Sequence, residues 1–459
     1  MKSRPATKSK HYKDSISKAE RYALGESIRK ECPIESHSGF NLREETDVAE
    51  LHVQNTQDRI RKLLPIRYER LMESPFAFYR GNAALMASHL VQMPSSKLYL
   101  QACGDCHLLN FGGFATPERK IVFDINDFDE TAVAPWEWDL KRLVASFAIA
   151  GDCKGFSTRE CHDAAWTVAN SYRKHMDEFA DMSALQIWYA QISIVDIIKS
   201  GKIKDARQFD PKAIKRAITA EPHERELAKF TFEKNGNPRI KDTPPLVFHV
   251  TPEKEHAFFS QAEKAYDRYV KTLPLDRRTL LQLYNIRDVA MKVVGVGSVG
   301  TRCGIMLLMS ATGDPLFLQF KEARQSVLER YLGKGKFAHN GQRVVEGQKL
   351  IQSASDIFLG WTADDAGKQF YIRQLRDAKI KPALESMDYH TFLSYACSCG
   401  WALARAHART GDPAILSGYM GGTEEVEEAM ALFAIAYAKQ NEEDYQKLQS
   451  VLQEKKLAI

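Results

Sequence analysis

Two short stretches near residue 100 decide the fold: residues 104–110 read GDCHLLN, and residues 124–129 read DINDFD. Asp105 is followed by Asn110 within the first stretch, and Asp127 comes after an apolar run in the second. A carboxylate can accept a proton from a hydroxyl. Hard oxygen ligands suit Mg²⁺, which proteins usually hold with one or two carboxylates together with phosphates. The pattern therefore predicts a catalytic base at Asp105 and metal ligands at Asn110 and Asp127.

Some roles in these stretches stay open at the level of sequence. Asp124 is an alternative metal ligand, because aspartates cluster at its end of the second stretch. Each Asp or Asn could also simply shape a turn through its own backbone. We expect His107 to belong to the catalytic loop and to form hydrogen bonds there rather than to transfer protons. Asp139 is expected to hold the loop from behind.

A second pattern lies much later in the chain. An apolar run at 287–294 leads to GVGSVG at 295–300, and further apolar runs at 304–309 and 316–320 flank a turn and end at Lys321. A dinucleotide-binding glycine loop should open a helix. Here a strand follows, so the pattern predicts a hairpin. Backbone without side chains can approach phosphates closely. The residues expected to bind nucleotide phosphates are Gly295, Gly297, Gly300 and Lys321.

We expect that lysine to have a carboxylate partner. Lys292 ends a tetrapeptide, VAMK, that resembles a phosphate-binding lysine motif, but it precedes the glycine loop, so Lys321 is assigned instead. A lysine ammonium on a flexible stem is poorly fixed without a carboxylate partner. A helix expected over 342–355 places Glu346 at its middle, and we predict that Glu346 pairs with Lys321. Glu329 is the alternative.

Composition bounds the class of protein. The chain has 459 residues, 44% of them hydrophobic and 27% charged, with a net charge of +5. This length exceeds a usual single core, so two lobes are expected. The basic residues are spread out, which gives no support for nucleic-acid binding. No apolar run reaches the ~20 residues that a membrane span needs, and the first 35 residues resemble no secretory signal. We expect a cytoplasmic protein.

The eight cysteines show no disulfide framework. Cys103 and Cys106 form a CxxC pair, and Cys397 and Cys399 form a CxC pair. Structural zinc usually takes two pairs with supporting spacing, whereas these pairs are far apart and unequal. We expect buried apolar thiols, with a thiol-redox protein as a remote alternative.

Helical patterns dominate outside the segments above. Helices are expected over residues 15–30, 47–73, 138–150, 158–179, 184–200, 252–271, 389–407, 424–440 and 443–454. Strands are expected over 97–102, 120–123, 358–362 and 369–375, and residues 200–250 are expected to be mostly connections. The predicted organisation is a basic tail and helix (1–45), a large-lobe segment with the catalytic and metal loops (46–274), a small ATP lobe (275–380) and helices that complete the large lobe (381–459).

The motifs resemble those of the aminoglycoside phosphotransferase and choline kinase branch of the protein-kinase-like superfamily. That branch carries His-Gly-Asp-x-His-x-x-Asn, then Asp-Phe, then a later Asp-Leu; the matching residues here are Asp105, His107, Asn110, Asp127 and Asp139. Cys103 stands where the branch has its first His. The resemblance implies an α+β, two-lobed kinase-like fold with a small antiparallel-sheet ATP lobe and a large, mainly helical lobe. Because the catalytic loop precedes the ATP lobe, it also implies a circular permutation.

Nearly the whole chain is similar to a bacterial family catalogued as domain of unknown function 2252. Stretches such as SPFAFYRG, WEWDLKRL, VGVGSVGTR, LARAHARTGD and SGYMGG carry this similarity. The family is grouped with kinase-like folds, so the resemblance supports an ATP site and gives no substrate.

The sequence thus predicts an ATP- and Mg²⁺-dependent phosphotransferase that acts on a hydroxyl of a small molecule. Two alternatives stay open: transfer of AMP by the same site, and a catalytically inactive protein that binds ATP for regulation. Oligomeric state is not predicted.

Overall fold

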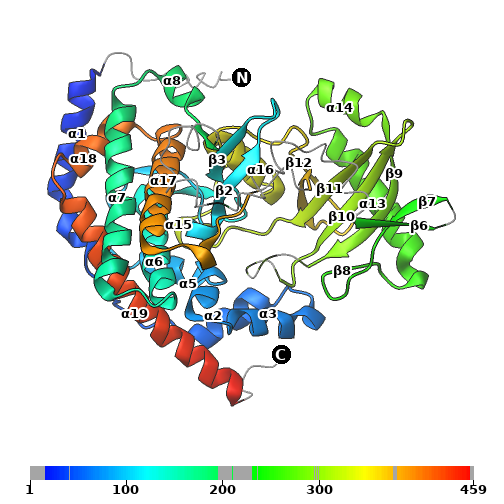
Figure 1. Ribbon diagram of the computed structural model, residues 1–459, viewed down its shortest axis with the longest axis horizontal. Helices are drawn as coiled ribbons and strands as arrows, with labels where there is room; N and C mark the ends of the chain where they lie inside the picture. The colour runs from blue at the N-terminus through cyan, green and yellow to red at the C-terminus, as the bar shows by residue number, and fades with distance from the viewer. Residues whose placement is uncertain are drawn as a thin grey trace, which may run out of the picture.

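The computed structural model describes residues 16–40, 42–194, 209, 230–234, 236–293, 295, 297, 299–375 and 380–454. It is a mixed α+β structure whose described sheets are all antiparallel. A bundle of long helices occupies one side, and a six-stranded sheet with two helices against it occupies the other (Figure 1). Within the described residues, no helix is long and apolar enough to cross a membrane.

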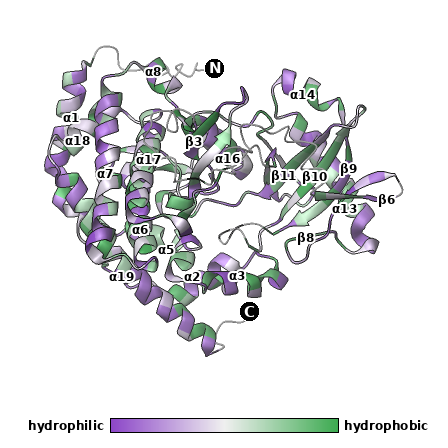
Figure 2. Cartoon of the chain, in the orientation of Figure 1, coloured by the Kyte–Doolittle hydropathy of each residue, from purple (hydrophilic) through white to green (hydrophobic). Residues whose placement is uncertain are grey.

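The helical side is built around one buried helix, α6 (Trp136–Cys153), nearly all of whose residues are buried. The long helices packed around it are α7 (Thr158–Ala180), α17 (Tyr389–Ala408) and α19 (Glu425–Gln453). α1 (Lys18–Glu31) and α18 (Pro413–Met420) form the outer layer. Hydrophilic and hydrophobic residues alternate along the outer helices, as amphipathic packing requires (Figure 2). Shorter helices outside the six-stranded sheet include η1 (Ile34–His37), α4 (Pro75–Arg80), α5 (Ala83–Leu90), η3 (Leu108–Asn110), α8 (Ala184–Tyr189) and η5 (Leu384–Ser386).

The six-stranded sheet contains the predicted glycine-loop strands. Its order is β12-β13-β11-β10-β9-β8, with β8 (Val247–Phe248), β9 (Tyr284–Lys292), β10 (Cys303–Ser310), β11 (Pro315–Glu322), β12 (Gly360–Ala363) and β13 (Gln369–Gln374). α16 (Asn340–Ile351) and the short α15 (Glu329–Leu332) lie between β11 and β12 in the chain. The apolar sides of α13 (Pro252–Val270) and α14 (Leu275–Leu281) cover one face of the sheet. The predicted order of strand, glycine loop, strand, turn and strand is confirmed.

The 104–129 region rests on small sheets beside the helices. β1 (Tyr99–Ala102) pairs with β4 (Ala132–Pro135), and β2 (Phe111–Ala115) pairs with β3 (Ile121–Ile125), which also pairs with β5 (Ile192–Ser193). β6 (Thr231–Lys234) and β7 (Asn237–Ile240) form a separate hairpin. The turn after β1 therefore carries the first motif, and the turn after β3 carries the second.

Four predicted helices differ from the structure. The single helix expected over 47–73 is wrong: the chain forms α2 (Val48–Thr56), η2 (Arg61–Leu63) and α3 (Leu64–Leu71). Pro65 at the start of α3 cannot continue a preceding helix, because it lacks an amide proton and clashes with the previous turn. The two helices expected over 424–454 are instead one, α19, in which Asn441 donates to the carbonyl of Pro75 at 3.0 Å. Of the helix expected over 184–200, α8 ends at Tyr189; residues 195–200, like most of 200–229, lie outside the described part.

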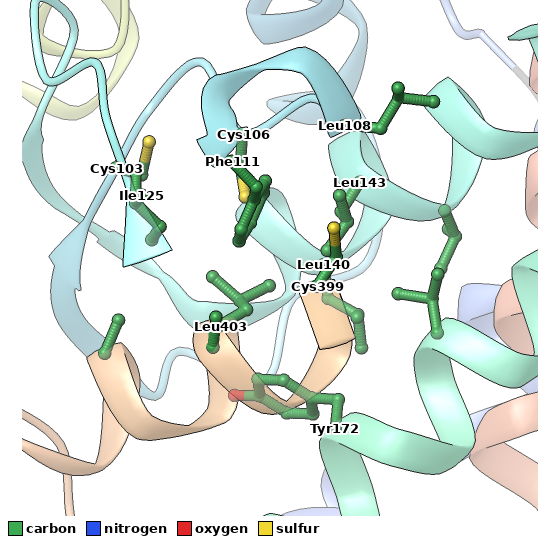
Figure 3. Close-up of a cluster of buried hydrophobic side chains, with 14 of the residues drawn as sticks. Cys103, Cys106, Leu108, Phe111, Ile125, Leu140, Leu143, Tyr172, Cys399 and Leu403 are labelled. Carbon is green, nitrogen blue, oxygen red and sulfur yellow. The ribbon is translucent and has the colours of Figure 1, made fainter. Parts of the chain in front are cut away.

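All eight cysteines are free thiols. Figure 3 shows Cys103, Cys106 and Cys399 among leucines and aromatic rings of the main core. Burial raises the pKa of the Cys106 thiol well above its ordinary value. A reactive thiol needs the opposite environment, so the CxxC pair is part of the core rather than a redox centre.

Candidate functional site

A cavity of about 820 Å³ lies between the 104–130 loops and the six-stranded sheet. It is lined by most of the side chains that the sequence singles out: Asp105, His107, Asn110, Asp127, Gly295, Gly297 and Lys321. The two sequence patterns, far apart in the chain, therefore meet at one site. Glu346 does not line this cavity.

Asp105 is fixed by a buried arginine from α6. Arg142 donates to Asp105 Oδ1 from Nε at 2.7 Å, and its Nη2 lies 2.5 Å from the same oxygen. Burial raises the pKa of Asp105, while the positive charge of Arg142 opposes that shift. Because both contacts use Oδ1, the ion pair leaves Oδ2 as the oxygen suited to accept a proton.

The rest of the loop orients around Asp105. Asn110 donates its side-chain amide to the backbone carbonyl of Asp105 at 2.7 Å, which directs its own carbonyl oxygen away as a free-standing acceptor. His107 Nε2 lies 3.9 Å from Asp105 Oδ2, beyond a hydrogen bond. Burial, with the charges of Arg80 and Arg142, holds the pKa of His107 well below its ordinary value. His107 is therefore neutral at pH 7, and it lies beside the base rather than on it.

Asp139 holds the loop from the start of α6, as predicted. Its two carboxylate oxygens accept from the amides of Cys103 at 2.6 Å and Gly104 at 2.9 Å. Gly104 has φ +87, and a Cβ there would lie 2.1 Å from the carbonyl oxygen of Glu130, so the turn requires glycine. His407 lies 3.3 Å from Asp139 Oδ2 and 2.8 Å from the hydroxyl of Tyr172. His407 thus belongs to this buried support and not to the cavity.

Lys321 reaches across from β11 to the second motif. Its ammonium forms an ion pair with Asp129 and lies 3.6 Å from Asp127 Oδ2. Burial alone would lower the pKa of Lys321, but Asp127 and Asp129 raise it well above its ordinary value. Tyr371 on β13 donates its hydroxyl to Asp129 Oδ1 at 2.8 Å. Asp129 is therefore occupied in anchoring Lys321, and Asp127 is the carboxylate more exposed to the cavity.

Asp124, the alternative metal ligand, is not at the site. Its side chain is fully buried, and Arg405 of α17 donates to its two oxygens at 2.7 and 2.8 Å. A carboxylate neutralised by a buried arginine has little capacity left for a metal ion. The structure thus distinguishes Asp127 from Asp124, which the sequence could not.

The prediction that Glu346 pairs with Lys321 is wrong. Glu346 lies 3.5 Å from Lys349 on the outer side of α16, whereas Val344, Val345, Gln348 and Ile351 form the buried side. Glu329 does not replace it: its carboxylate accepts from the amide of Gly335 at 2.9 Å and lies 4.0 Å from Arg343. The helix presents Arg343 to the second motif instead, where it donates to the carbonyl of Asp129 at 2.8 Å.

The glycine loop is bonded to the N-terminal helices. Arg59 donates to the carbonyl oxygen of Val299 at 2.6 Å. The amide of Ile60 donates to the carbonyl oxygen of Gly300 at 2.8 Å. Arg67 donates to the carbonyl of Gly297 at 3.0 Å. Among the described residues, no atom lies within 4 Å of where a Cβ on Gly295 would stand, and Gly295 lines the cavity.

Three residues of the site were missed or left undecided at the level of sequence: Arg142, Asp129 and Arg80. Arg142 could have been found, because it follows Asp139 by three positions and so shares a face of the same helix. No feature of the surrounding sequence distinguished Asp129 from the neighbouring aspartates. Arg80, which lines the cavity, depends on the tertiary fold for its position.

The residues of the site suit a Mg²⁺ ion that is also bound by phosphates. They suit less well a metal ion that is bound by protein ligands alone. Within the described residues, no group of three His, Cys, Asp or Glu side chains converges to hold a metal ion. Mg²⁺ does not need such a group, since one or two protein ligands with waters and phosphates are usual. Asn110 and Asp127 would be those ligands, and Lys321 would lie next to the phosphates.

Neither a curated protein nor a solved structure matches the chain. One family does: residues 59–451 match the family described as "uncharacterized protein conserved in bacteria". This range includes every residue of the cavity discussed above except the few N-terminal to Arg59. Since the match covers most of the chain, the protein belongs to this bacterial family, DUF2252.

Proposed function

We propose that this protein is a phosphotransferase that moves the γ-phosphoryl group of ATP, in a Mg²⁺-dependent manner, to a hydroxyl of a small molecule. One observation carries the proposal: Asp105, Asn110 and Asp127 share a cavity with Lys321, which comes from a different part of the chain. A base, two hard ligands and a cation at one cleft are the parts that phosphoryl transfer uses.

Each residue has a distinct task in the proposed reaction. Asp105 accepts the proton of the acceptor hydroxyl on Oδ2, while Arg142 keeps the carboxylate oriented through Oδ1. Lys321 stabilises negative charge on the phosphates, and Asn110 and Asp127 hold Mg²⁺, which supplies further charge neutralisation when bound. The acceptor oxygen gains the phosphoryl group as the bond to ADP breaks. Catalysis consists of positioning and charge stabilisation.

The element order supports a permuted kinase-like fold as part of this proposal. β9, the glycine loop, β10, β11 with its lysine, α16, β12 and β13 follow one another as the elements of a kinase small lobe would. The catalytic turns come earlier in the chain, and α17, the helix that would lead into them, comes later. Such a reordering keeps contacts inside the fold intact, because chain ends usually lie at the surface.

The test is a screen of hydroxyl-bearing metabolites with purified protein and Mg²⁺, using ATP labelled at either the γ- or the α-phosphate. The proposal expects label from the γ-position in a new product, ADP as the other product, and no reaction in EDTA. Label from the α-position would show AMP transfer. Tight nucleotide binding with no product from any pool would favour an inactive ATP-binding regulator. Absence of nucleotide binding would reject the proposal.

The AMP-transfer alternative has two observations in its favour. The cavity is large, and the glycine loop is bonded to Arg59 and Arg67 rather than standing alone over the site. A metal and a glycine loop can hold a triphosphate in more than one orientation. A half-buried carboxylate oriented by Arg142 favours a catalytic site over an inactive one, because a binding site has no use for a base.

A further inference from the structure

The cavity contains more positive charge on one wall than its own carboxylates neutralise. Lys321 is paired with Asp127 and Asp129. A second group of cations lies toward the N-terminal helices: Arg59, Arg67, Arg80 and Arg324, which all line the same cavity. We call these four residues the arginine wall.

The carboxylates nearest to the arginine wall are already engaged. Glu322 lies 3.2 Å from Arg302 and accepts from its amide at 2.9 Å. Glu130 accepts from the amide of Val327 at 2.7 Å. Asp58 lies 3.5 Å from Arg324 but is largely exposed to solvent. An exposed pair at this distance contributes little, so Asp58 does little to neutralise the charge of Arg324.

Arg80 is the clearest case. Its guanidinium forms no hydrogen bond or ion pair with any described residue, and its Nε is buried without a partner. The central carbon of its guanidinium lies 5.9 Å from the centre of the Phe76 ring. An arginine has five donors, and burying one without an acceptor is costly unless a ligand supplies it.

Repulsion among the arginines of the wall also indicates that the wall binds an anion. Burial lowers the pKa of Arg59 well below its ordinary value, and the charges of Arg67 and Arg324 lower it further. Burial also lowers the pKa of Arg80. Like charges gathered in a partly desolvated wall are favourable only when an anion joins them.

The position of Arg80 assigns the anion to the acceptor rather than to the nucleotide. Arg142, which holds Oδ1 of Asp105, also donates to the carbonyl of Tyr79 at 3.1 Å, so the next residue, Arg80, lies at the base end of the cavity. The phosphates of a nucleotide would lie at the other group of cations, beside Asp127 and Lys321. An acceptor that places its hydroxyl at Asp105 brings the remainder of the molecule to Arg80.

We propose that the acceptor is itself an anion, a small molecule that bears a phosphate or carboxylate group in addition to its hydroxyl, and that Arg80 binds that group. This inference rests on the proposed function, in which the acceptor is the molecule whose hydroxyl receives the phosphoryl group. Arginine suits the task because its planar fork matches carboxylate and phosphate geometry.

The test uses the full chain saturated with Mg²⁺ and a non-hydrolysable ATP analogue, titrated with inorganic phosphate in one arm and succinate in the other. We expect at least one anion to bind. Arg80→Gln should lower the affinity for that anion on the order of 10-fold or more, while the affinity for the ATP analogue stays unchanged. Arg61→Gln is the matched control: it removes the same charge from an exposed position on the neighbouring η2, which does not line the cavity. Arg80 makes no bond that folding would miss, so the variant should fold.

Three results would overturn the inference: neither anion binds, Arg80→Gln leaves anion binding unchanged, or both anions displace the analogue and Arg80→Gln weakens the analogue. The last would assign the arginine wall to the triphosphate. Failure of the proposed function would look different, because the protein would then not bind the ATP analogue at all, whatever the anions do. Arg324→Gln, with a weaker expected loss, provides a second variant of the same wall.

Discussion

At the scale of single residues, the chemistry of the site depends on which carboxylate oxygens are already bonded to neighbouring side chains. Arg142 occupies Oδ1 of Asp105, and Tyr371 and Lys321 occupy the two oxygens of Asp129. Asp124 is occupied on both oxygens by Arg405. The chemistry is therefore decided by these partners and not by the aspartates alone.

Asp105→Asn should retain nucleotide binding and lose turnover. The change removes the proton acceptor but keeps the shape, and an amide can still contact Arg142 weakly. We expect a loss of about 10²-fold or more in turnover, the usual contribution of a general base, with the dissociation constant for Mg·ATP nearly unchanged. Stopped assays of ADP release and equilibrium binding measure the two quantities. Full turnover in this variant would place the base elsewhere.

The same base sets the acid side of the pH profile. Because burial raises the pKa of Asp105, activity should fall as the pH drops through a value above the ordinary ~3.9 of aspartate. Arg142→Gln removes the charge that opposes the shift, so the acid limb should move to higher pH. Profiles of turnover against pH for both proteins give the comparison. An unmoved or lowered limb would contradict the assigned base.

Lys321 and Asp129 should behave as one unit. Lys321→Ala and Asp129→Ala should each impair nucleotide use, and the double variant should be little worse than either, because each single change leaves a buried charge without its partner. Glu346→Ala is the control and should have no effect, since Glu346 pairs with Lys349 on the surface of α16. Nucleotide dissociation constants for the four proteins test this. Additive losses would mean that the pair does not act together.

At the scale of elements, close approach of backbones positions the outer helices. Gly25 of α1 and Gly418 of α18 face each other: a Cβ on Gly25 would lie 2.1 Å from the carbonyl oxygen of Ile415, and one on Gly418 would lie 2.0 Å from that of Tyr22. Two helices can approach this closely only where side chains are absent.

Gly418→Ala should accordingly destabilise the protein by forcing α1 away from α18. Overpacking of this kind costs about 1–3 kcal/mol in free energy of unfolding, which corresponds to a melting temperature lowered by about 1–3 °C in a chain this size. Gly422→Ala, where a Cβ would meet nothing within 4 Å, is the control. Calorimetry of both variants measures the difference, and equal melting temperatures would show that the helices adjust freely.

Elements were predictable from sequence where the pattern was local. The strands around the glycine loop follow from apolar runs bounded by turns, and Lys321 from its place at the end of one of them. The break of 47–73 into α2, η2 and α3 was signalled only by Pro65. The failure at Glu346 has a different cause: a position in the middle of a helix does not say which side faces the site, and here the apolar side of α16 turns Glu346 outward.

At the scale of the whole molecule, burial of neutral histidines should govern stability in acid. His37, His52 and His89 are buried, and burial lowers their pKa values to about 3, about 3 and about 4 from the ordinary 6.5. The unfolded chain binds a proton at each histidine below pH 6.5 that the folded protein does not. Stability contributed by the neutral rings is thus fully present above pH 6.5 and is lost as the pH falls toward 4 and 3.

His52→Leu should reduce the pH dependence of the unfolding free energy by the contribution of one proton. Both ring nitrogens of His52 are buried without a hydrogen-bond partner among the described residues, so an apolar side chain of similar size sacrifices no bond. The slope of unfolding free energy against pH between 4 and 6.5 should fall by about 1.4 kcal/mol per pH unit relative to the unchanged protein. Urea unfolding at several pH values gives both slopes. Parallel slopes would show that His52 is protonated when folded.

The site as a whole was only half visible in the sequence. Local motifs named Asp105, Asn110, Asp127 and Lys321, which the fold brings to one cavity. The contacts of Arg59 and Arg67 with the glycine loop, and the exposure of Arg80 to the cavity, join segments that share no local pattern. Long-range pairings of this kind depend on the packing of the complete chain, so a single sequence carries no direct sign of them.

The ion pair between Lys321 and the two aspartates has a consequence for the order in which ligands arrive. While the cleft is empty, this cation and these anions satisfy each other. A nucleotide without its metal would bring four negative charges toward Asp127 and Asp129 and would have to compete with them for Lys321. On the proposed function, a nucleotide that carries Mg²⁺ would offer Asp127 a new cation as Lys321 turns to the phosphates. The resting cleft is therefore arranged for exchange, and it should admit the metal complex while excluding the free nucleotide.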